Sequence, residues 1–134
     1  MRLAVLGASG LVGRSMLSLL SRQDWITGAP LALTSARSAG LELPFGEGPV
    51  TCRDVATADL ASIDVAIFSA GGAASRQWAP RFVQAGAAVV DNSSAWRQDP
   101  AVPLVVPEVN GHLVGPGHRG IIANPNCSTI QIAL

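Results

Sequence analysis

Short apolar runs that each end in glycine or a polar loop recur along the chain, and this pattern constrains the fold more than any other feature. The runs are Leu3–Leu6, Leu31–Thr34, Val65–Phe68, Ala87–Val90, Leu104–Val106 and Ile121–Ala123. A continuous apolar run of this kind is typical of a parallel strand that is covered on both faces. Helical patterns separate several of the runs. We therefore expect an α/β fold, a Rossmann-like doubly wound and mostly parallel sheet with helices on both faces.

The segments between these runs divide into helices, a loop and one further strand. A helix that begins at Leu11 is expected to bury one face, which consists of Val12, Met16, Leu19 and Leu20. A second helix is predicted over Ala74–Ala85, with Gly86 as its C-terminal cap. The stretch Ser35–Pro49 is rich in glycine and proline and is predicted to be a loop. Val50–Val55 alternates between apolar and polar residues, as a half-exposed or edge strand does.

Length and charge exclude several functional classes. The chain has 134 residues, 49% of them hydrophobic, which suits one folded domain rather than a disordered segment. Nine arginines balance nine acidic residues and there is no lysine, so no charged surface points to nucleic acid or to an anionic membrane. Glycines interrupt the N-terminal apolar run, which therefore does not read as a signal peptide. Two cysteines make no disulfide framework, and we expect a cytoplasmic protein.

A glycine motif connects the first predicted strand to the first predicted helix. The segment Gly7–Gly13 reads Gly-Ala-Ser-Gly-Leu-Val-Gly, a GxxGxxG turn. In such a turn Gly7 permits the tight bend, Gly10 lets the backbone approach a pyrophosphate, and Gly13 lets the helix pack closely on the strand. The amides at the start of the helix suit an anion. The spacing alone is also compatible with a glycine-rich turn of any α/β protein.

The end of the second strand bears on which dinucleotide would bind. An NAD site usually places Asp or Glu there, whereas an NADP site has small polar groups and an arginine for the 2′-phosphate. Here Ser35, Arg37 and Ser38 follow the strand, and no carboxylate occurs before Glu42. The pattern favours NADP, and the alternative for Arg37 is a solvated surface arginine.

A cysteine stands between the last strand and a helical pattern. Cys127 follows Ile121–Ala123 and precedes Ile130–Leu134. Backbone amides and the helix dipole at such a position favour a nucleophilic thiolate and suit a developing oxyanion. The alternative is a buried and inert cysteine, which is the interpretation we give to Cys52 in its alternating strand.

An arginine beside an aromatic residue follows the Ala87–Val90 run. Arg97 offers a planar fork for phosphate or carboxylate, and Trp96 is placed to hold its plane. A surface salt bridge from Arg97 to Asp91 or Asp99 explains the spacing equally well. The two histidines lie in a glycine-rich stretch and are assigned no role, and no metal site is predicted.

Taken in order, six motifs resemble the N-terminal half of the bacterial aspartate-β-semialdehyde dehydrogenases. They are Gly7–Gly13, Ser35–Gly40, Phe68–Gly72, Asp91–Arg97, Val106–Asn110 and Ile122–Thr129. The resemblance covers nearly the whole chain. It implies an NADP-dependent oxidoreductase that converts β-aspartyl phosphate reversibly to aspartate β-semialdehyde and inorganic phosphate, on the route to lysine, threonine, methionine and diaminopimelate.

The resemblance also implies roles for individual residues. Cys127 would form the acyl-thioester, Arg97 would bind the substrate phosphate, and Asn126 would lie beside that phosphate. Ser9 to Val12 would hold the cofactor pyrophosphate, and Arg37 with Ser38 its 2′-phosphate. With the glycine motif, the expected cofactor residues are Gly7, Ser9, Gly10, Leu11, Val12, Gly13, Ser35, Arg37, Ser38, Ser69, Gly71 and Gly72.

The sequence departs from the family pattern at its end. Family members have a second domain with an acid/base histidine, an arginine for the substrate carboxylate, a glutamine near the cysteine and most of the dimer interface. The sequence ends at Leu134, so we expect residues 1–134 to be an NADP-binding fragment, inactive alone, from a homo-oligomeric parent (dimer or tetramer). A C-terminal helix also returns to the cofactor domain in the family, and its absence is expected to leave apolar surface exposed.

Other functions remain compatible with these motifs. One is a catalytically incomplete nucleotide-binding module. Another is a reductase similar to N-acetyl-γ-glutamyl-phosphate reductase, although that family has Gly before its cysteine and Tyr-Pro after it, where this chain has Asn126 and Ser128-Thr129. A malonyl-CoA reductase is a lesser possibility.

Overall fold

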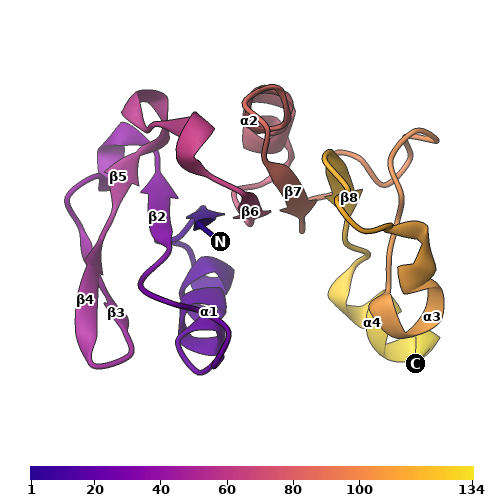
Figure 1. Cartoon of the computed structure of the whole chain (residues 1–134), viewed down its shortest axis with the longest axis horizontal. Helices are drawn as coiled ribbons and strands as arrows, with labels where there is room; N and C mark the ends of the chain where they lie inside the picture. Colours follow the sequence, from indigo (N-terminus) through magenta and orange to yellow (C-terminus); the bar gives the residue numbers. More distant parts are fainter.

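Six parallel strands form the central sheet of the computed structural model, which describes residues 1–134. Along the sheet the order is β5 (Arg53–Asp54), β2 (Leu31–Thr34), β1 (Leu3–Leu6), β6 (Val65–Phe68), β7 (Ala88–Asp91) and β8 (Ile121–Ala123). Every neighbouring pair is parallel, and β1 lies between β2 and β6 (Figure 1). The predicted Rossmann-like α/β fold is confirmed.

Helices cover both faces of this sheet. Figure 1 shows α1 (Leu11–Leu20) on one face and α2 (Gly72–Gln84) on the other, with α3 (Pro107–Asn110) and α4 (Cys127–Ala133) on the side of α1. Short 3₁₀ helices lie at Ala36–Ser38, Val55–Thr57, Leu60–Ser62 and Gly111–Leu113. None of the helices combines the length and the apolarity that crossing a bilayer requires.

Two apolar clusters hold the helices on the sheet, and β1 contributes to both. Leu3 and Val5 belong to the cluster beneath α1, whereas Ala4 and Leu6 belong to the cluster beneath α2. Successive side chains of a strand point to opposite faces, so a strand covered on both sides needs an unbroken apolar run. This requirement explains why the strand segments were recognisable in the sequence.

Helix α2 begins two residues before its predicted start and ends at Gln84, one residue before its predicted end. Gly86 has a φ of 102° and its amide donates to the carbonyl of Val83 at 3.0 Å. The amide of Ala87 donates to the carbonyl of Phe82 at 3.0 Å. This pair of bonds is a Schellman motif, in which the left-handed conformation suits glycine. Gly86 therefore ends the helix as predicted.

The buried face of α1 differs in part from the prediction, since Leu20 is the only one of the four predicted residues that is buried. Gly13, Leu17 and Leu20 face the sheet, whereas Val12 is 45% exposed and Leu19 is 60% exposed. A Cβ on Gly13 would lie 2.1 Å from the carbonyl oxygen of Gly7, so the helix approaches the strand through its glycine. This close approach sets the rotation of the helix and turns Val12 and Leu19 away from the sheet.

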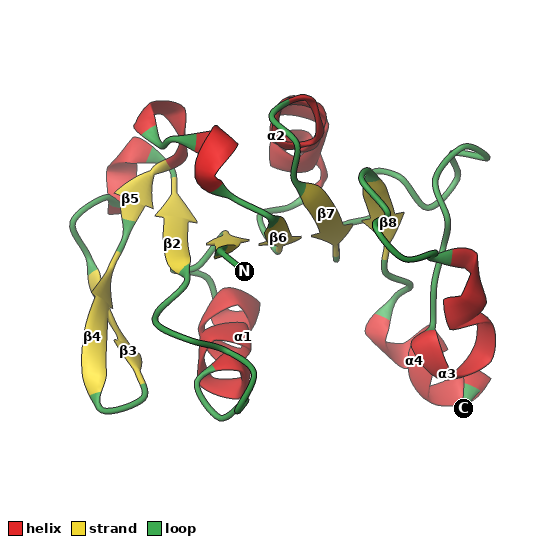
Figure 2. Cartoon of the chain, viewed as in Figure 1, coloured by secondary structure: helices red, strands yellow, loops and turns green.

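The stretch predicted as a loop contains a β-hairpin. After the 3₁₀ turn, β3 (Glu42–Phe45) pairs antiparallel with β4 (Gly48–Thr51), as Figure 2 shows. The prolines of the two strands face each other across the ribbon, while Leu43 and Val50 are buried against α1. Proline is tolerated in edge strands, and both strands of a two-stranded ribbon are edges. The glycines and prolines were therefore misread as marking a loop.

Two of the predicted strands are also shorter than expected. Val50–Val55 does not form one strand, because β4 ends at Thr51 and β5 is a separate strand that pairs with β2. Leu104 makes only an isolated bridge to Ala123, and the chain then enters α3 at Pro107. A proline has no amide to continue a ladder, which ends the strand pattern there.

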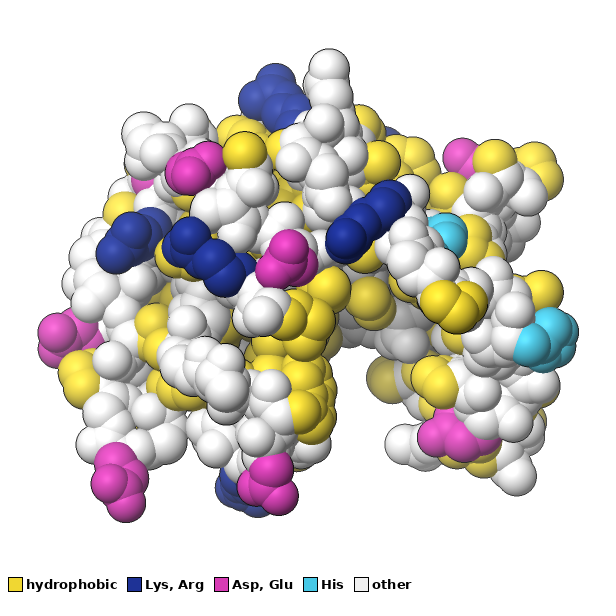
Figure 3. Space-filling model, viewed as in Figure 1, with side chains coloured by type: hydrophobic (Ala, Val, Ile, Leu, Met, Phe, Trp, Pro, Cys, Tyr) yellow, Lys and Arg dark blue, Asp and Glu magenta, His cyan; other side chains and the backbone are white.

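One face of the sheet is incompletely covered. On the α1 side, Ile67, Val90 and Ile122 lie side by side on β6, β7 and β8, and each is only partly buried. Figure 3 shows a hollow between α1 and the α3–α4 segment, with hydrophobic side chains along its wall. An apolar cavity of about 270 Å³ adjoins it, bordered by Val90 and Ile122. The expected exposed apolar surface is present on this face.

Candidate functional site

A cleft of about 360 Å³ opens where β1, β2 and β6 end. Its walls are formed by Leu6, Gly7, Ser9, Gly10, Thr34, Ser35, Val55, Ser69, Ala70, Ala74 and Trp78. After β1 the chain forms β2, which lies beside one edge of β1, and later forms β6, which lies beside the other edge. The direction of strand order therefore reverses at β1, and the cleft lies at the topological switch point of the fold. Ligands of open α/β sheets bind at such a point, beyond the carboxyl ends of the strands.

The glycine motif shapes the floor of this cleft. Gly7 has a φ of 86°, and a Cβ there would lie 2.2 Å from the carbonyl oxygen of Ser69. Its amide donates to the carbonyl of Leu33 at 2.9 Å, which ties the turn to β2. A Cβ on Gly10 would meet only the carbonyl oxygen of Gly7, at 3.4 Å. Gly7 and Gly13 are therefore required by close backbone contacts, whereas Gly10 lies in a more open position.

The other predicted cofactor residues surround the cleft, and some lie outside its walls. Ser9, Gly10, Ser35 and Ser69 line it. Leu11 and Val12 form the first turn of α1, whose amides have no partner within the helix. Arg37 and Ser38 stand in the 3₁₀ turn after β2, and the Arg37 side chain is exposed. Gly71 caps α2 with a φ of 82°, and Gly72 is the first residue of that helix.

Six lining residues were not among the predicted cofactor residues. These are Leu6, Thr34, Val55, Ala70, Ala74 and Trp78. Trp78 is half-buried on α2, with the Arg81 guanidinium 4.8 Å from its ring centroid. Its position on the helix that follows β6, a strand at the switch point, could have indicated a place in the cleft. An aromatic residue on such a helix is more simply interpreted as part of the core, and Trp78 does also pack against the α2-side cluster.

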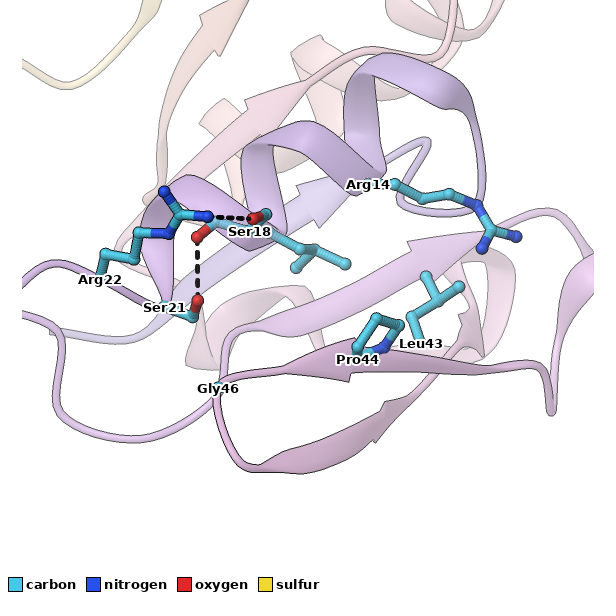
Figure 4. A pocket seen from close by; sticks show the side chains of 8 residues that line it. Arg14, Ser18, Ser21, Arg22, Leu43, Pro44 and Gly46 are labelled. Atoms are coloured by element: carbon cyan, nitrogen blue, oxygen red, sulfur yellow. Dashed lines mark hydrogen bonds between the residues drawn. The ribbon is translucent and has the colours of Figure 1, made fainter.

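A larger cavity, of about 420 Å³, lies between α1 and the β3–β4 hairpin and contains none of the predicted site residues. Arg14 and Arg22 occupy opposite ends of it, and their guanidinium groups point apart (Figure 4). Arg14 Nε donates to the carbonyl of Ser9 at 2.9 Å, and Ser21 Oγ donates to the carbonyl of Ser18 at 2.9 Å. Each of these donors is thus bonded to a nearby backbone carbonyl, and the side chains do not converge on a common point.

A buried polar network anchors the loop after β7. Asp91 is fully buried and accepts hydrogen bonds from the hydroxyl of Ser75 and from the amide and hydroxyl of Ser93. The indole of Trp96 donates to the Ser75 hydroxyl at 2.8 Å. A buried carboxylate needs several donors to offset its lost hydration. The network therefore fixes the loop to α2, and Trp96 serves this network rather than the plane of Arg97.

Arg97 is held by two backbone carbonyls rather than by a carboxylate. Its Nε donates to the carbonyl oxygen of Asn124 at 3.0 Å, and its Nη2 donates to that of Asn92 at 3.0 Å. The Asp91 carboxylate is engaged by serines, and the nearby Asp99 accepts from the amide of Ala101. The alternative of a surface salt bridge is therefore wrong. Arg97 instead connects the loops that follow β7 and β8.

Cys127 is exposed and is the first residue of α4. The side chain of Asn126 caps that helix, because its Oδ1 accepts from the amide of Ser128 at 2.9 Å. One of the first-turn amides is thus already committed to the cap. Arg97 is bonded to the carbonyl of Asn124, three residues before Cys127, so its guanidinium contacts the segment that leads to the thiol. No group of three His, Cys, Asp or Glu side chains is placed to hold a metal ion.

The two thiols are expected to react at very different rates. Cys52 is 2% exposed, and burial raises the pKa of its thiol, against a smaller opposing effect of Arg14. Because the thiolate is the nucleophile, Cys52 should alkylate slowly at neutral pH and faster as pH rises, whereas Cys127 should alkylate rapidly. Iodoacetamide labelling followed by peptide mass spectrometry measures both rates. Equal slow rates at the two positions would contradict an accessible nucleophile at Cys127.

This architecture defines a dinucleotide-binding domain that carries an accessible thiol at the start of the helix after its last strand. The family model described as "Semialdehyde dehydrogenase, NAD binding domain" matches residues 2–115. The chain belongs to this semialdehyde dehydrogenase family.

Similar proteins point to one branch of the family. The chain is 47% identical over 135 residues to an aspartate-semialdehyde dehydrogenase of Aquifex aeolicus, covering 99% of this chain and 40% of that protein. A crystal structure of aspartate semialdehyde dehydrogenase II from Vibrio cholerae, complexed with ASA, superposes with a TM-score of 0.91 at 42% identity. That match covers 98% of this chain and 43% of the other.

A more distant structure has a named cofactor. The aspartate semialdehyde dehydrogenase of Candida albicans, solved with NADP, matches with a TM-score of 0.76 at 26% identity, over 96% of this chain and 43% of that one. The chain spans about two fifths of the length of the curated relatives it matches.

Proposed function

We propose that residues 1–134 are the cofactor-binding and nucleophile-bearing part of an NADP-dependent aspartate-semialdehyde dehydrogenase. The reaction is the reversible reductive dephosphorylation of β-aspartyl phosphate to aspartate β-semialdehyde, within amino-acid biosynthesis in the cytoplasm. One observation carries this proposal. The dinucleotide cleft lies at the same edge of one sheet as Arg97 and the Asn124–Cys127 segment to which Arg97 is hydrogen-bonded.

Strand spacing supports a shared site. The cleft is bounded by β1, β2 and β6, and the loops with Arg97 and Cys127 follow β7 and β8, the next two strands. Neighbouring strands lie about 4.8 Å apart, so β8 is roughly 10 Å from β6. A dinucleotide that spans the cleft has the length to reach the thiol. The close contacts of Gly7 and Gly13, which exclude side chains from the turn, fit the approach of a pyrophosphate.

The second strand favours NADP over NAD. The carboxyl end of β2 is followed by Ser35, Arg37 and Ser38, and the next carboxylate, Glu42, is in the hairpin. A 2′-phosphate would therefore meet a cation and hydroxyls, whereas the ribose of NAD would lack its usual carboxylate partner.

Replacement of Arg37 by alanine should separate the two cofactors. A charge-assisted contact to phosphate contributes about 1.5–3 kcal/mol, so NADPH affinity should fall about 10- to 100-fold while NADH affinity changes little. Calorimetric titration of both cofactors measures the effect. Arg22→Ala, at the far end of α1, serves as the control and should change neither affinity. An equal loss for NADPH and NADH would show that Arg37 does not contact the 2′-phosphate.

The chemistry assigns a role to each group. The thiolate of Cys127 attacks the acyl carbon of the substrate, the carbon–oxygen bond to phosphate breaks, and Arg97 binds the departing phosphate as an acyl-thioester forms. When bound, the nicotinamide cofactor supplies a hydride to that acyl carbon. The thiolate then leaves from the resulting hemithioacetal and releases the aldehyde. A thiol suits both halves because it is a good nucleophile and a good leaving group.

A chimera tests the proposed function. Residues 1–134 are joined to the remaining C-terminal part of the Aquifex aeolicus relative, and this protein is called the Aquifex chimera below. It should reduce β-aspartyl phosphate with NADPH and show far lower rates with N-acetyl-γ-glutamyl phosphate and malonyl-CoA. Residues 1–134 alone should bind NADPH without sustained turnover. A folded chimera that binds NADPH but reduces none of the three substrates would favour a catalytically incomplete nucleotide-binding module.

The uncovered sheet face also fits this proposal. Ile67, Val90 and Ile122 expose apolar area between α1 and the α3–α4 segment. We assign this face to the C-terminal helix that returns to the cofactor domain in the family. A homo-oligomeric parent, as expected from the resemblance, forms part of the same proposal.

A further inference from the structure

The way Arg97 is held limits how it can meet an anion. An arginine guanidinium has five N–H donors, arranged as a side edge formed by Nε and Nη2 and an outer edge formed by Nη1 and Nη2. In Arg97 the carbonyls of Asn124 and Asn92 occupy the side edge, each at 3.0 Å. Both Nη1 hydrogens and the second Nη2 hydrogen remain, and one hydrogen from each of these two nitrogens forms the outer edge. An anion that accepts two hydrogen bonds from Arg97 must therefore meet the outer edge.

An amide pair fixes the spacing of the two carbonyls. Asn124 Nδ2 donates to Asn92 Oδ1 at 2.7 Å, so the residues whose carbonyls hold Arg97 are also bonded to each other through their side chains. Their backbones are tied to the sheet, because the amide of Asn124 donates to the Asp91 carbonyl at 2.8 Å and that of Asn92 to the Phe68 carbonyl at 3.0 Å. The guanidinium thus rests on a frame attached to three neighbouring strands.

We propose that the Asn92–Asn124 side-chain pair positions Arg97, so that the outer edge of its guanidinium faces an anionic group beside Cys127. The inference rests on the proposed function, in which Arg97 binds the substrate phosphate. Neither asparagine touches the reacting atoms in this account. They act through Arg97, and because Asn124 lies three residues before Cys127, at most about 10 Å along the chain, the same pair sets the distance from cation to thiol.

Two alkylating reagents of opposite character test this arrangement on the 134-residue chain. Iodoacetate is anionic and iodoacetamide is neutral, while both alkylate a thiolate in the same way. The ratio of their rates at Cys127 reports the cation beside the thiol, and general destabilisation changes both rates together. Labelling of the buried Cys52 reports unfolding independently.

The expected results distinguish the positioning role of the two asparagines from the phosphate-binding role of Arg97. Arg97→Gln should lower the iodoacetate-to-iodoacetamide ratio roughly five-fold, as expected for loss of a nearby unit charge. Asn92→Ala and Asn124→Ala should lower it most of the way to the Arg97→Gln value. Asn110→Ala, which removes two hydrogen bonds from an asparagine at the end of α3, should leave the ratio unchanged.

Two outcomes would overturn these assignments separately. If Arg97→Gln lowers the ratio while both asparagine variants retain the wild-type value, the positioning role is wrong and the phosphate role of Arg97 stands. If Arg97→Gln leaves the ratio unchanged, the proposed role of Arg97 fails and the inference fails with it. If Cys52 becomes reactive in the asparagine variants, these variants are partly unfolded, and Arg97→Lys is used to test the inference instead. That variant keeps the charge but has no guanidinium edge, so its ratio should fall, and a wild-type ratio would overturn the inference.

Discussion

Replacement of Cys127 by serine in the Aquifex chimera is expected to lower turnover of β-aspartyl phosphate by at least about 10⁴-fold. The hydroxyl of serine is far less ionised than a thiol near neutral pH, and its alkoxide is a poorer leaving group than a thiolate, so both halves of the reaction should slow. Substrate and cofactor binding should persist. Steady-state rates of NADPH oxidation, with NADPH affinity measured in parallel, check this result.

The matched control for this substitution is Cys52→Ser. Cys52 is buried beneath α1 and takes no part in the proposed chemistry, so its variant should retain turnover and lose only stability. Appreciable turnover by Cys127→Ser would contradict the acyl-thioester. Equal loss of activity in the two variants, with both still folded, would show that neither thiol has a specific chemical role.

Replacement of Gly7 by alanine is expected to lower the free energy of unfolding by about 2–5 kcal/mol, a large part of the roughly 5–15 kcal/mol typical of a domain. The new Cβ would lie 2.2 Å from the carbonyl oxygen of Ser69, and backbone atoms cannot move aside as a flexible side chain does. The positive φ of 86° adds strain of its own. Urea denaturation followed by tryptophan fluorescence measures the change.

Gly40 separates the two causes. Its φ is 88°, nearly that of Gly7, but a Cβ there would meet nothing within 4 Å. Gly40→Ala should therefore cost only the conformational term, about 1–2 kcal/mol. If Gly7→Ala and Gly40→Ala cost the same, the close approach of the turn to Ser69 contributes nothing. A greater loss at Gly7, accompanied by loss of NADPH binding, is the result that the structure predicts.

The parallel strands were predictable because burial on both faces leaves a strong local signature. β1 and β6 are unbroken apolar runs, since each has a helix-side cluster on either face. The β3–β4 hairpin was missed because its signature is the opposite. Pro44 and Pro49 read as loop residues, and only packing against α1 shows that Leu43 and Val50 form the buried side of a ribbon.

The rotation of α1 shows why an apolar pattern can mislead. Val12 and Leu19 fit an apolar helical stripe as well as Leu17 does, yet they lie on the exposed side of α1. What decides between the two stripes is the contact between Gly13 and Gly7, in which the smallest side chain brings helix and strand together. Helical periodicity carries no information about such a contact. The glycine motif did indicate this contact, because Gly13 was the residue expected to let the helix pack closely on the strand.

Some features of the candidate site were likewise predictable from the local sequence, whereas others depend on the tertiary structure. The glycine turn and the position of Cys127 were visible locally, because a loop after a strand and before a helix is a recognisable sequence context. The partners of Arg97 were not, because the carbonyls that bind it belong to Asn92 and Asn124, on separate loops brought together by the pairing of β7 and β8. Trp78 was missed for the same reason, since its place in the cleft depends on how α2 crosses the sheet.

The most direct measurement is a single-turnover reaction of the Aquifex chimera with aspartate β-semialdehyde and NADP⁺ in the absence of phosphate. Without phosphate the acyl group has no acceptor, so the acyl-thioester mechanism predicts one equivalent of NADPH per chain and an aspartyl thioester on Cys127, identified by peptide mass spectrometry and released by hydroxylamine. Formation of NADPH with Cys127 unmodified would contradict this mechanism.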